Sequence, residues 1–334
     1  MTVNNDEALI LMYHRIVEAD MDPWGMCVGP RHFSEQLEAI RTLGTPLGLL
    51  DYVRQREQGE LPPRPIVLTF DDGYLDNLDD ALPLLARHAV PATVFITTGN
   101  IGSEEEFWWD WLEAMLLRPA QLPERLVLAL PTGEASWELG EAARYDEAQR
   151  AGDRWTNAWQ ATPGSRLGLF YDVWKHLWPL DPTPRRAAMH VLADWSGVRT
   201  PPALPRRTMT AAEIGRLAAS EWITIGAHTV AHPPLPAHPV EVQTREILDS
   251  QRVLRDITGG AITAFAYPHG EYSDATIDVL QAGGFECAVT VEQKLSLPST
   301  DVMKLPRFGV KDLGGDAFLA KFAPLFAAAR GVAA

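Results

Sequence analysis

Two histidines and two aspartates have the types and the spacing of a metal site. His228 and His232 lie four residues apart in the sequence Gly-Ala-His-Thr-Val-Ala-His-Pro, and Asp71 and Asp72 end the apolar run Pro-Ile-Val-Leu-Thr-Phe. One carboxylate and two imidazoles are a sufficient protein ligand set for a catalytic zinc that keeps a position open for water. A second carboxylate beside them can act as the base, so the pattern indicates hydrolytic chemistry.

Each pair also has an ordinary structural interpretation. An Asp-Asp pair at the end of a strand is often a helix N-cap, and Asp-Gly is a common turn pair. A His-x-x-x-His spacing is often one face of a helix, but Pro233 and Pro234 prevent a regular helix from continuing here. This favours a loop that holds both histidines as ligands. The remaining histidines have no comparable context and are interpreted as surface or core residues: His32, His88, His176, His190 and His238.

The elements that must position these residues are predicted from alternating apolar runs and helical periodicity, which are typical of a parallel sheet covered by helices. We expect strands at residues 8–13, 66–70, 92–97, 222–227, 262–267 and 287–290. We expect helices at 31–43, 75–88, 240–258 and 273–282. His14, the Asp pair and the His pair all follow strand ends. In a parallel barrel the loops converge there, so these side chains are expected to meet.

One long stretch interrupts the alternation. Between about residues 103 and 207 no strand is evident, tryptophans are concentrated, and the exit at 201–205 is rich in proline. Connections of this length are usually functional or separate folding units. We therefore predict a barrel formed by residues 1–102 and 208–334, and a mostly helical insertion at 103–207 near the mouth of the active site.

Composition and charge limit the possible partners. The chain has 334 residues, of which 46% are hydrophobic, and a net charge of -15. The negative charge argues against nucleic acid and against an anionic membrane surface. Cys27 and Cys287 are expected to be buried reduced thiols. Because the first residues are acidic and no apolar run reaches roughly 18 residues, we expect a cytoplasmic protein without membrane insertion.

The string Thr-Phe-Asp-Asp-Gly at 69–73 and the string His-Thr-Val-Ala-His-Pro at 228–233 resemble two motifs of the polysaccharide deacetylase superfamily, carbohydrate esterase family 4. The resemblance implies a distorted (β/α)7 barrel. It also implies that Asp71 is the catalytic base and that Asp72, His228 and His232 hold a divalent metal. Zinc is the expected ion, and cobalt or nickel would also suit this ligand set.

Three further segments are similar to family motifs. Phe-Ala-Tyr-Pro-His-Gly at 265–270 resembles the third motif, which implies that the main-chain amide of His269 binds the oxyanion and that Tyr267 lies at the substrate. The arginine that usually orients the base is absent, because Ala266 stands in its place. As in a branch that includes bacterial exopolysaccharide deacetylases, Tyr-His at 13–14 implies that His14 is the general acid, and Arg307 in Leu-Pro-Arg-Phe is the candidate for orienting Asp71.

The start of the insertion also resembles some bacterial members. Trp108, Trp109 and Asp110 follow the strand end near residue 97 at a short distance. Aromatic faces stack on sugar rings, and a carboxylate accepts hydrogen bonds from hydroxyl groups. We therefore expect these three residues to contact the substrate, while the other tryptophans of the insertion are expected to be packing residues.

These features predict a metal-dependent N-deacetylase that acts on an acetamido sugar. Two alternatives remain open, a metal-independent amidohydrolase that opens a cyclic amide and a catalytically silent carbohydrate-binding protein. The absence of an evident export signal, the acidic charge and the insertion favour a small or oligosaccharide substrate, either nucleotide-linked, free or a glycan precursor. The oligomeric state is not predicted by the sequence.

Overall fold

The strands of the barrel come from apolar runs that are buried on both faces, as parallel strands covered by helices require. β5 (Pro65–Phe70) and β6 (Ala92–Ile96) are buried at every position. The computed structural model describes residues 7–103, 106–199 and 207–328. In it these strands belong to one parallel sheet with the order β11-β10-β9-β6-β5-β1-β12, and β4 pairs with the start of β5. The other strands are β1 (Leu9–Tyr13), β4 (Thr45–Leu47), β9 (Ile223–Ala227), β10 (Ala264–Ala266), β11 (Cys287–Val289) and β12 (Phe308–Gly309).

Residues 305–309 connect the two ends of this sheet. Leu305 forms a parallel bridge with Val289 of β11, while β12 pairs in parallel with Leu11 and Met12 of β1. The sheet is therefore curled into the distorted (β/α)7 barrel that the motifs implied. The expected strands correspond to β1, β5, β6, β9, β10 and β11, whereas β4 and β12 were not predicted.

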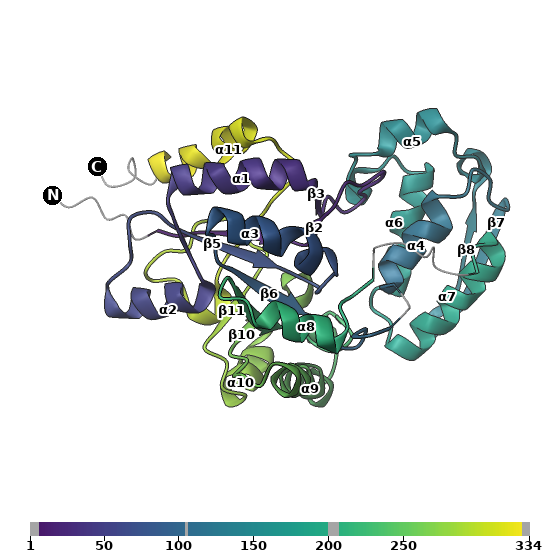
Figure 1. Cartoon of the computed structure of the whole chain (residues 1–334). Helices are drawn as coiled ribbons and strands as arrows, with labels where there is room; N and C mark the ends of the chain where they lie inside the picture. The colour runs from purple at the N-terminus through teal and green to yellow at the C-terminus, as the bar shows by residue number, and fades with distance from the viewer. Residues whose placement is uncertain (1–6, 104–105, 200–206, 329–334) are drawn as a thin grey trace. The chain divides into compact units, whose positions relative to one another are not determined.

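Seven helices of the described chain belong to the barrel unit: α1 (Pro30–Leu43), α2 (Leu49–Gln58), α3 (Leu82–His88), α8 (Ala211–Ala218), α9 (Val240–Thr258), α10 (Asp274–Ala282) and α11 (Gly315–Ala328). α1 buries Phe33, Leu37 and Ile40, which recur at helical spacing on one face. α9 ends where Gly259 adopts a φ of 70° and donates to Arg255 O. The first and last of these helices, α1 and α11, lie side by side (Figure 1).

The expected helix at 75–88 differs from the observed structure in its first half. A π-helical turn, η1 (Asn77–Ala81), precedes α3. Two short strands, β2 (Arg15–Ile16) and β3 (Cys27–Val28), also lie outside the predicted elements and pair with each other in parallel. Single π-helical turns occur frequently at functional sites, and this one follows the Asp pair by a few residues.

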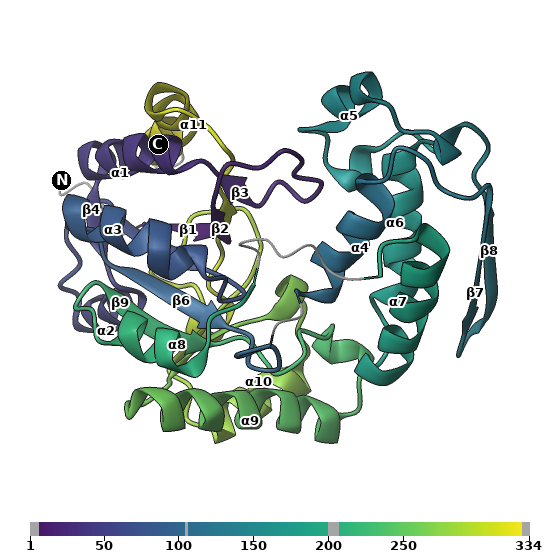
Figure 2. The same cartoon turned by 45° about the vertical axis from the view of Figure 1, so that its right-hand side comes forward.

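A second compact unit comprises residues 19–25 and 103–207, and it has its own hydrophobic core. Its elements are α4 (Trp108–Leu117), β7 (Arg125–Leu130), β8 (Gly133–Glu138), α5 (Glu147–Asp153), α6 (Arg166–Leu177) and α7 (Pro182–Ser196). Four of these elements are helices, and the hairpin of β7 and β8, which pair in antiparallel fashion, was not among the expected strands (Figure 2). The segment 19–25 was also not expected to belong to this unit.

Two findings bear on the expected environment of the chain. Cys27 and Cys287 are both buried free thiols, and burial raises the pKa of Cys287 to about 12. Within residues 7–103, 106–199 and 207–328, no helix has both the length and the apolar character that crossing a membrane requires.

Candidate metal and catalytic centre

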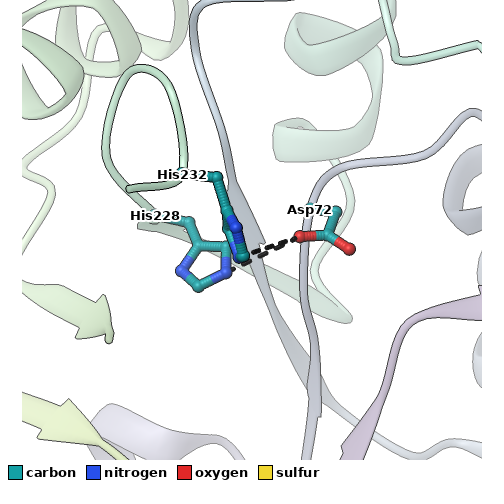
Figure 3. A group of neighbouring side chains, drawn as sticks. All are labelled: Asp72, His228 and His232. Atoms are coloured by element: carbon teal, nitrogen blue, oxygen red, sulfur yellow. Dashed lines mark ion pairs between the residues drawn. The ribbon is translucent and has the colours of Figure 1, made fainter. Parts of the chain in front are cut away.

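Three side chains meet at the carboxyl end of the sheet in a geometry that fits a metal. Asp72 follows β5, and His228 and His232 follow β9. The two Nε2 atoms lie 3.6 Å and 3.7 Å from Asp72 Oδ1, and the rings point toward this carboxylate (Figure 3). With bonds of about 2.0–2.1 Å, two ligands of one tetrahedral zinc lie about 3.3 Å apart, so the set fits a single ion. It is the one such group of His, Cys, Asp or Glu within the described residues.

His228 presents a defined ring nitrogen to this centre. Its side chain is 2% exposed, and Nδ1 lies 2.7 Å from the carbonyl oxygen of Ala266 on β10. Because a carbonyl oxygen only accepts, Nδ1 is assigned the hydrogen and donates it. Burial lowers the pKa of His228 in spite of the nearby Asp71 carboxylate, so the neutral ring directs the lone pair of Nε2 toward Asp72. Metal-ligating histidines are usually held in this way.

The loop that carries both histidines is fixed by a carboxylate from α9. Glu246 Oε2 accepts hydrogen bonds from the main-chain amides of Val230 and Ala231 at 2.9 Å and 2.8 Å. Within the loop, Thr229 Oγ1 accepts from the amide of His232 at 3.0 Å. Sequence reasoning did not single out Glu246. The available signal was a carboxylate on the inward face of an amphipathic helix, one position before the buried Ile247.

Backbone strain is concentrated around the same centre. Among the described residues, six non-glycine residues have a positive φ, and four of them belong to this site. These are Asp72 at 75°, Thr229 at 64°, His232 at 55° and His269 at 57°. Non-glycine residues in this region cost roughly 1–3 kcal/mol each and persist only where the surroundings impose them. The strain therefore supports a functional interpretation of these loops.

Replacing Glu246 by alanine is expected to weaken metal binding. The loop would lose the acceptor for two amides, and outer-shell changes of this kind typically lower metal affinity roughly 10- to 100-fold. Glu246→Gln keeps an oxygen acceptor and should have the smaller effect. The zinc dissociation constant, measured by competition with a chromophoric chelator, checks this. Glu241→Ala, at an exposed position of α9, is the matched control, and equal affinities in all four proteins would contradict the prediction.

Arg307 holds the carboxylate of Asp71. Arg307 was named from the sequence as the residue that replaces the arginine missing at position 266, and this contact agrees with that. The catalytic roles of both residues stay predictions. Nη1 and Nη2 of Arg307 donate to Oδ1 and Oδ2 of Asp71 at 2.7 Å and 2.8 Å. Thr69 Oγ1 and the carbonyl oxygen of Thr290 accept further hydrogen bonds from the guanidinium. Burial by itself would raise the pKa of Asp71, but the charge and hydrogen bonds of the Arg307 guanidinium lower it to about 2. The carboxylate is therefore ionised at neutral pH.

Replacing Arg307 by methionine is expected to destabilise the fold by about 3–5 kcal/mol, because a buried carboxylate would lose its partner. The folded-state pKa of Asp71, about 2, lies below its ordinary value of 3.8. The stability from this pair is therefore fully present above about pH 4 and is lost as pH falls toward 2. Urea unfolding at several pH values checks the prediction, with the exposed Arg54→Met as control. A stability difference that does not shrink in acid would contradict it.

His14 lies beside the same carboxylate. Its Nε2 is 4.0 Å from Asp71 Oδ2, and its side chain is 17% exposed. Burial lowers the pKa of His14 to about 4, against the opposing effect of Asp71 and with a further lowering by Arg307. The structure thus brings the predicted acid next to the predicted base, and His14 is neutral at pH 7 before substrate binds.

The third motif is only partly as expected. His269 lies in the short turn Pro268–Gly270 with a positive φ, and its ring packs against that of His232 at a centroid distance of 4.5 Å. The oxyanion contact of its amide stays a prediction. The side chain of Tyr267 is in the barrel core, 1% exposed, and its hydroxyl donates to Met303 O at 2.9 Å. The Tyr267 hydroxyl is therefore engaged in the core, and the expected place of Tyr267 at the substrate stays a prediction.

Trp108, Trp109 and Asp110 form the first turn of α4 in the second unit. Trp109 stacks on the ring of Phe107 at a centroid distance of 4.3 Å. The guanidinium of Arg185 lies over Trp108, with its central carbon 4.8 Å from the centroid of the indole ring. These contacts belong to the packing of the second unit, and the expected contact of all three residues with substrate stays a prediction.

The sequence model of the polysaccharide deacetylase family matches residues 58–123 and 181–288, just over half of the 334-residue chain. The chain belongs to the polysaccharide deacetylase family. This confirms the resemblance predicted from the motifs. The matched stretches of this family member contain the Asp pair and the His pair, whereas His14 and Arg307 lie outside them.

Two curated relatives are similar to part of this deacetylase family member. A poly-beta-1,6-N-acetyl-D-glucosamine N-deacetylase from Staphylococcus epidermidis is 28% identical over 111 residues, which cover 29% of this chain and 38% of the relative. The protein of the same name from Staphylococcus aureus is 27% identical over 112 residues, covering 30% and 39%. The match therefore spans less than half of either relative's length.

Solved structures of deacetylases share the fold of this family member. IcaB from Ammonifex degensii aligns with a TM-score of 0.57 and 16% identity, covering 96% of this chain and 97% of that one. The Streptococcus pyogenes deacetylase PplD, solved in complex with acetate, aligns with a TM-score of 0.54 and 20% identity, covering 94% and 97%. At these identities the likeness concerns the fold alone.

Proposed function

We propose that this chain is a metal-dependent hydrolase that removes the N-acetyl group from an acetamido sugar. The observation that supports this most strongly is the ionised, Arg307-bound carboxylate of Asp71 directly beside the Asp72, His228 and His232 set. Adjacent residues of one strand-end loop thus supply a base and a metal ligand. This is the combination that hydrolysis of an amide by activated water requires.

A divalent ion held by Asp72 and the two histidines would supply Lewis-acid activation of the water and of the acyl carbonyl. Asp71 accepts the proton of the attacking water, and Arg307 holds its two oxygens in place for this step. The main-chain amide of His269 is the proposed donor to the oxyanion of the tetrahedral species. One such donor is typically worth about 3 kcal/mol of transition-state stabilisation.

The leaving nitrogen must be protonated, because an amide nitrogen does not depart readily as an anion. His14 is the proposed acid. Since the pKa of His14 is lowered to about 4, His14 is neutral at first and gains its proton during the reaction. Asp71, 4.0 Å away, is placed to pass on the proton taken from water. The C–N bond then breaks, the nitrogen leaves as an amine, and the acyl group leaves as acetic acid, which ionises to acetate.

Zinc is the proposed ion, with cobalt or nickel as substitutes, because one carboxylate and two imidazoles suit all three. Incubating the protein with a chelator should abolish acetate release from β-1,6-linked N-acetylglucosamine oligomers, and adding zinc back should restore it. Acetate release that is indifferent to chelation would favour the metal-independent amidohydrolase. Sugar binding without acetate release at any metal concentration would favour the silent binding protein. The presence of Asp71 as a base argues against the silent binding protein, and the presence of Asp72, His228 and His232 argues against the metal-independent amidohydrolase.

The substrate is proposed to contain N-acetylglucosamine, because the names of the similar staphylococcal proteins specify a polymer of this sugar. The number of sugar units in the substrate is untested, and the expectation of a small substrate stays a prediction. We expect kcat/KM to be highest for the free or nucleotide-linked sugar or a short oligomer. A series from the monosaccharide to a hexamer, with the nucleotide-linked sugar as a separate arm, checks this. A value of kcat/KM that rises steadily with length would instead favour an open groove and a polymeric substrate.

A further inference from the structure

His14 occupies a distinctive place in the chain. β1 ends at Tyr13 and β2 begins at Arg15, so His14 is the single residue between two strands. Arg15 is 3% exposed, and its partner Asp76, at the N-cap of the π-helical turn η1, is 4% exposed. A buried ion pair of this kind lies next to the proposed acid and takes no part in the chemistry described above.

Asp76 contacts the two residues that follow His14. Its Oδ2 accepts a hydrogen bond from Arg15 Nε at 3.0 Å and lies 2.9 Å from Arg15 Nη2. Its Oδ1 accepts from the main-chain amide of Ile16 at 3.1 Å. One carboxylate therefore fixes both a side chain and the main chain of β2. The guanidinium of Arg15 also lies over the ring of Tyr74, 4.5 Å from its centroid.

Asn77 completes the connection to His14 itself. Its Nδ2 donates to the carbonyl oxygen of His14 at 2.8 Å and lies within hydrogen-bond distance of Asp76 Oδ1, at 3.2 Å. Asn77 is the first residue of η1, and the amide of Asp71 donates to Tyr13 O at 3.0 Å. The loop that carries the base thus holds the main chain on both sides of the acid.

We propose that Asp76 and Asn77 are positioning residues that hold His14 at its distance from Asp71 and at the leaving nitrogen. This inference rests on the proposed acid role of His14. A buried ion pair is weak evidence for stability, because the cost of removing two charges from water offsets much of their attraction. Positioning explains why the contacts converge on residues 14–16. A displacement of about 1 Å in a catalytic group can lower the rate roughly 100-fold.

The test uses two substrates that differ in their need for an acid. An N-acetylglucosamine oligomer requires protonation of its leaving nitrogen, whereas 4-nitrophenyl acetate has a leaving group that departs as an anion. Asp76→Asn and Asn77→Ala should each lower kcat on the oligomer roughly 10- to 100-fold while the ester rate stays within about twofold. The ester rate also reports folding, because it still requires Asp71 and the metal site. Asp79→Asn, at an exposed position of η1, is the matched control and should change neither rate.

A double-mutant cycle decides whether the effect passes through His14. In a His14→Ala background, Asp76→Asn and Asn77→Ala should cause no further loss on the oligomer. Equal losses on both substrates, no loss on either, or full additivity with His14→Ala would each overturn the inference. If His14→Ala itself lowers both rates equally, the acid role fails and the inference fails with it. If His14→Ala lowers only the oligomer rate but Asp76→Asn and Asn77→Ala do not, the positioning role alone would be overturned.

Discussion

Replacing Asp72, His228 or His232 by alanine is expected to remove bound metal and activity together. A three-ligand site has no spare donor, and each of these side chains lies within 4.8 Å of the other two through its ligand atom. Metal content measured by elemental analysis should fall from one ion per chain to a trace, and acetate release should fall with it. This is the largest effect we expect of any single substitution.

Thermal unfolding gives a second measurement of the same site. Zinc at 100 times its dissociation constant stabilises a protein that binds it only when folded by about 2.7 kcal/mol. The melting temperature of the wild-type chain should therefore rise on addition of zinc, and the melting temperatures of the three variants should not. His176→Ala, at an exposed histidine of α6, is the control. It should retain its bound metal and the rise in melting temperature on addition of zinc. Variants that keep full metal and full turnover would show that the site is elsewhere.

The second large effect is expected for Asp71→Asn. Asparagine keeps the size of the side chain and cannot take a proton from water, so turnover should fall by roughly two to four orders of magnitude while metal content is unchanged. His14→Ala should lower turnover on an acetamido sugar to a similar extent. The two variants differ in the step that they impair, and the choice of substrate separates those steps.

An ester with a good leaving group needs a base to activate water but no acid to protonate the departing atom. Such an ester should therefore restore the rate of His14→Ala and leave Asp71→Asn slow. The ratio of ester to amide turnover, compared with that of the wild-type chain, measures the difference. Equal recovery of both variants, or of neither, would contradict the assigned roles.

Sequence patterns predicted most of the barrel strands and the Asp and His pairs of the candidate metal site. Apolar runs such as 66–70 are buried on both faces, and this burial makes them recognisable without knowledge of their neighbours. β7 was missed because its exposed and buried positions alternate while nearly all of its residues, Arg-Leu-Val-Leu-Ala-Leu, are apolar. The sequence therefore lacks the polar-apolar alternation that marks a half-exposed strand. β4 and β12 have three and two residues, too few for a periodic pattern.

The sequence by itself determined which residue types follow the strand ends, and therefore which residues form the candidate Asp-His-His site and which chemistry is proposed for it. Arg307 was named in advance only through its resemblance to a family motif, and the tertiary structure showed that it holds Asp71 across 236 residues. Only the tertiary structure revealed that Glu246, on the helix that follows the histidine loop, accepts a hydrogen bond from an amide of that loop. Asp76 reaches Arg15 across 61 residues, and Tyr267 turns its hydroxyl into the core. The physical reason is that local patterns report burial and turn geometry, whereas a hydrogen bond between distant residues depends on the order and curvature of the strands.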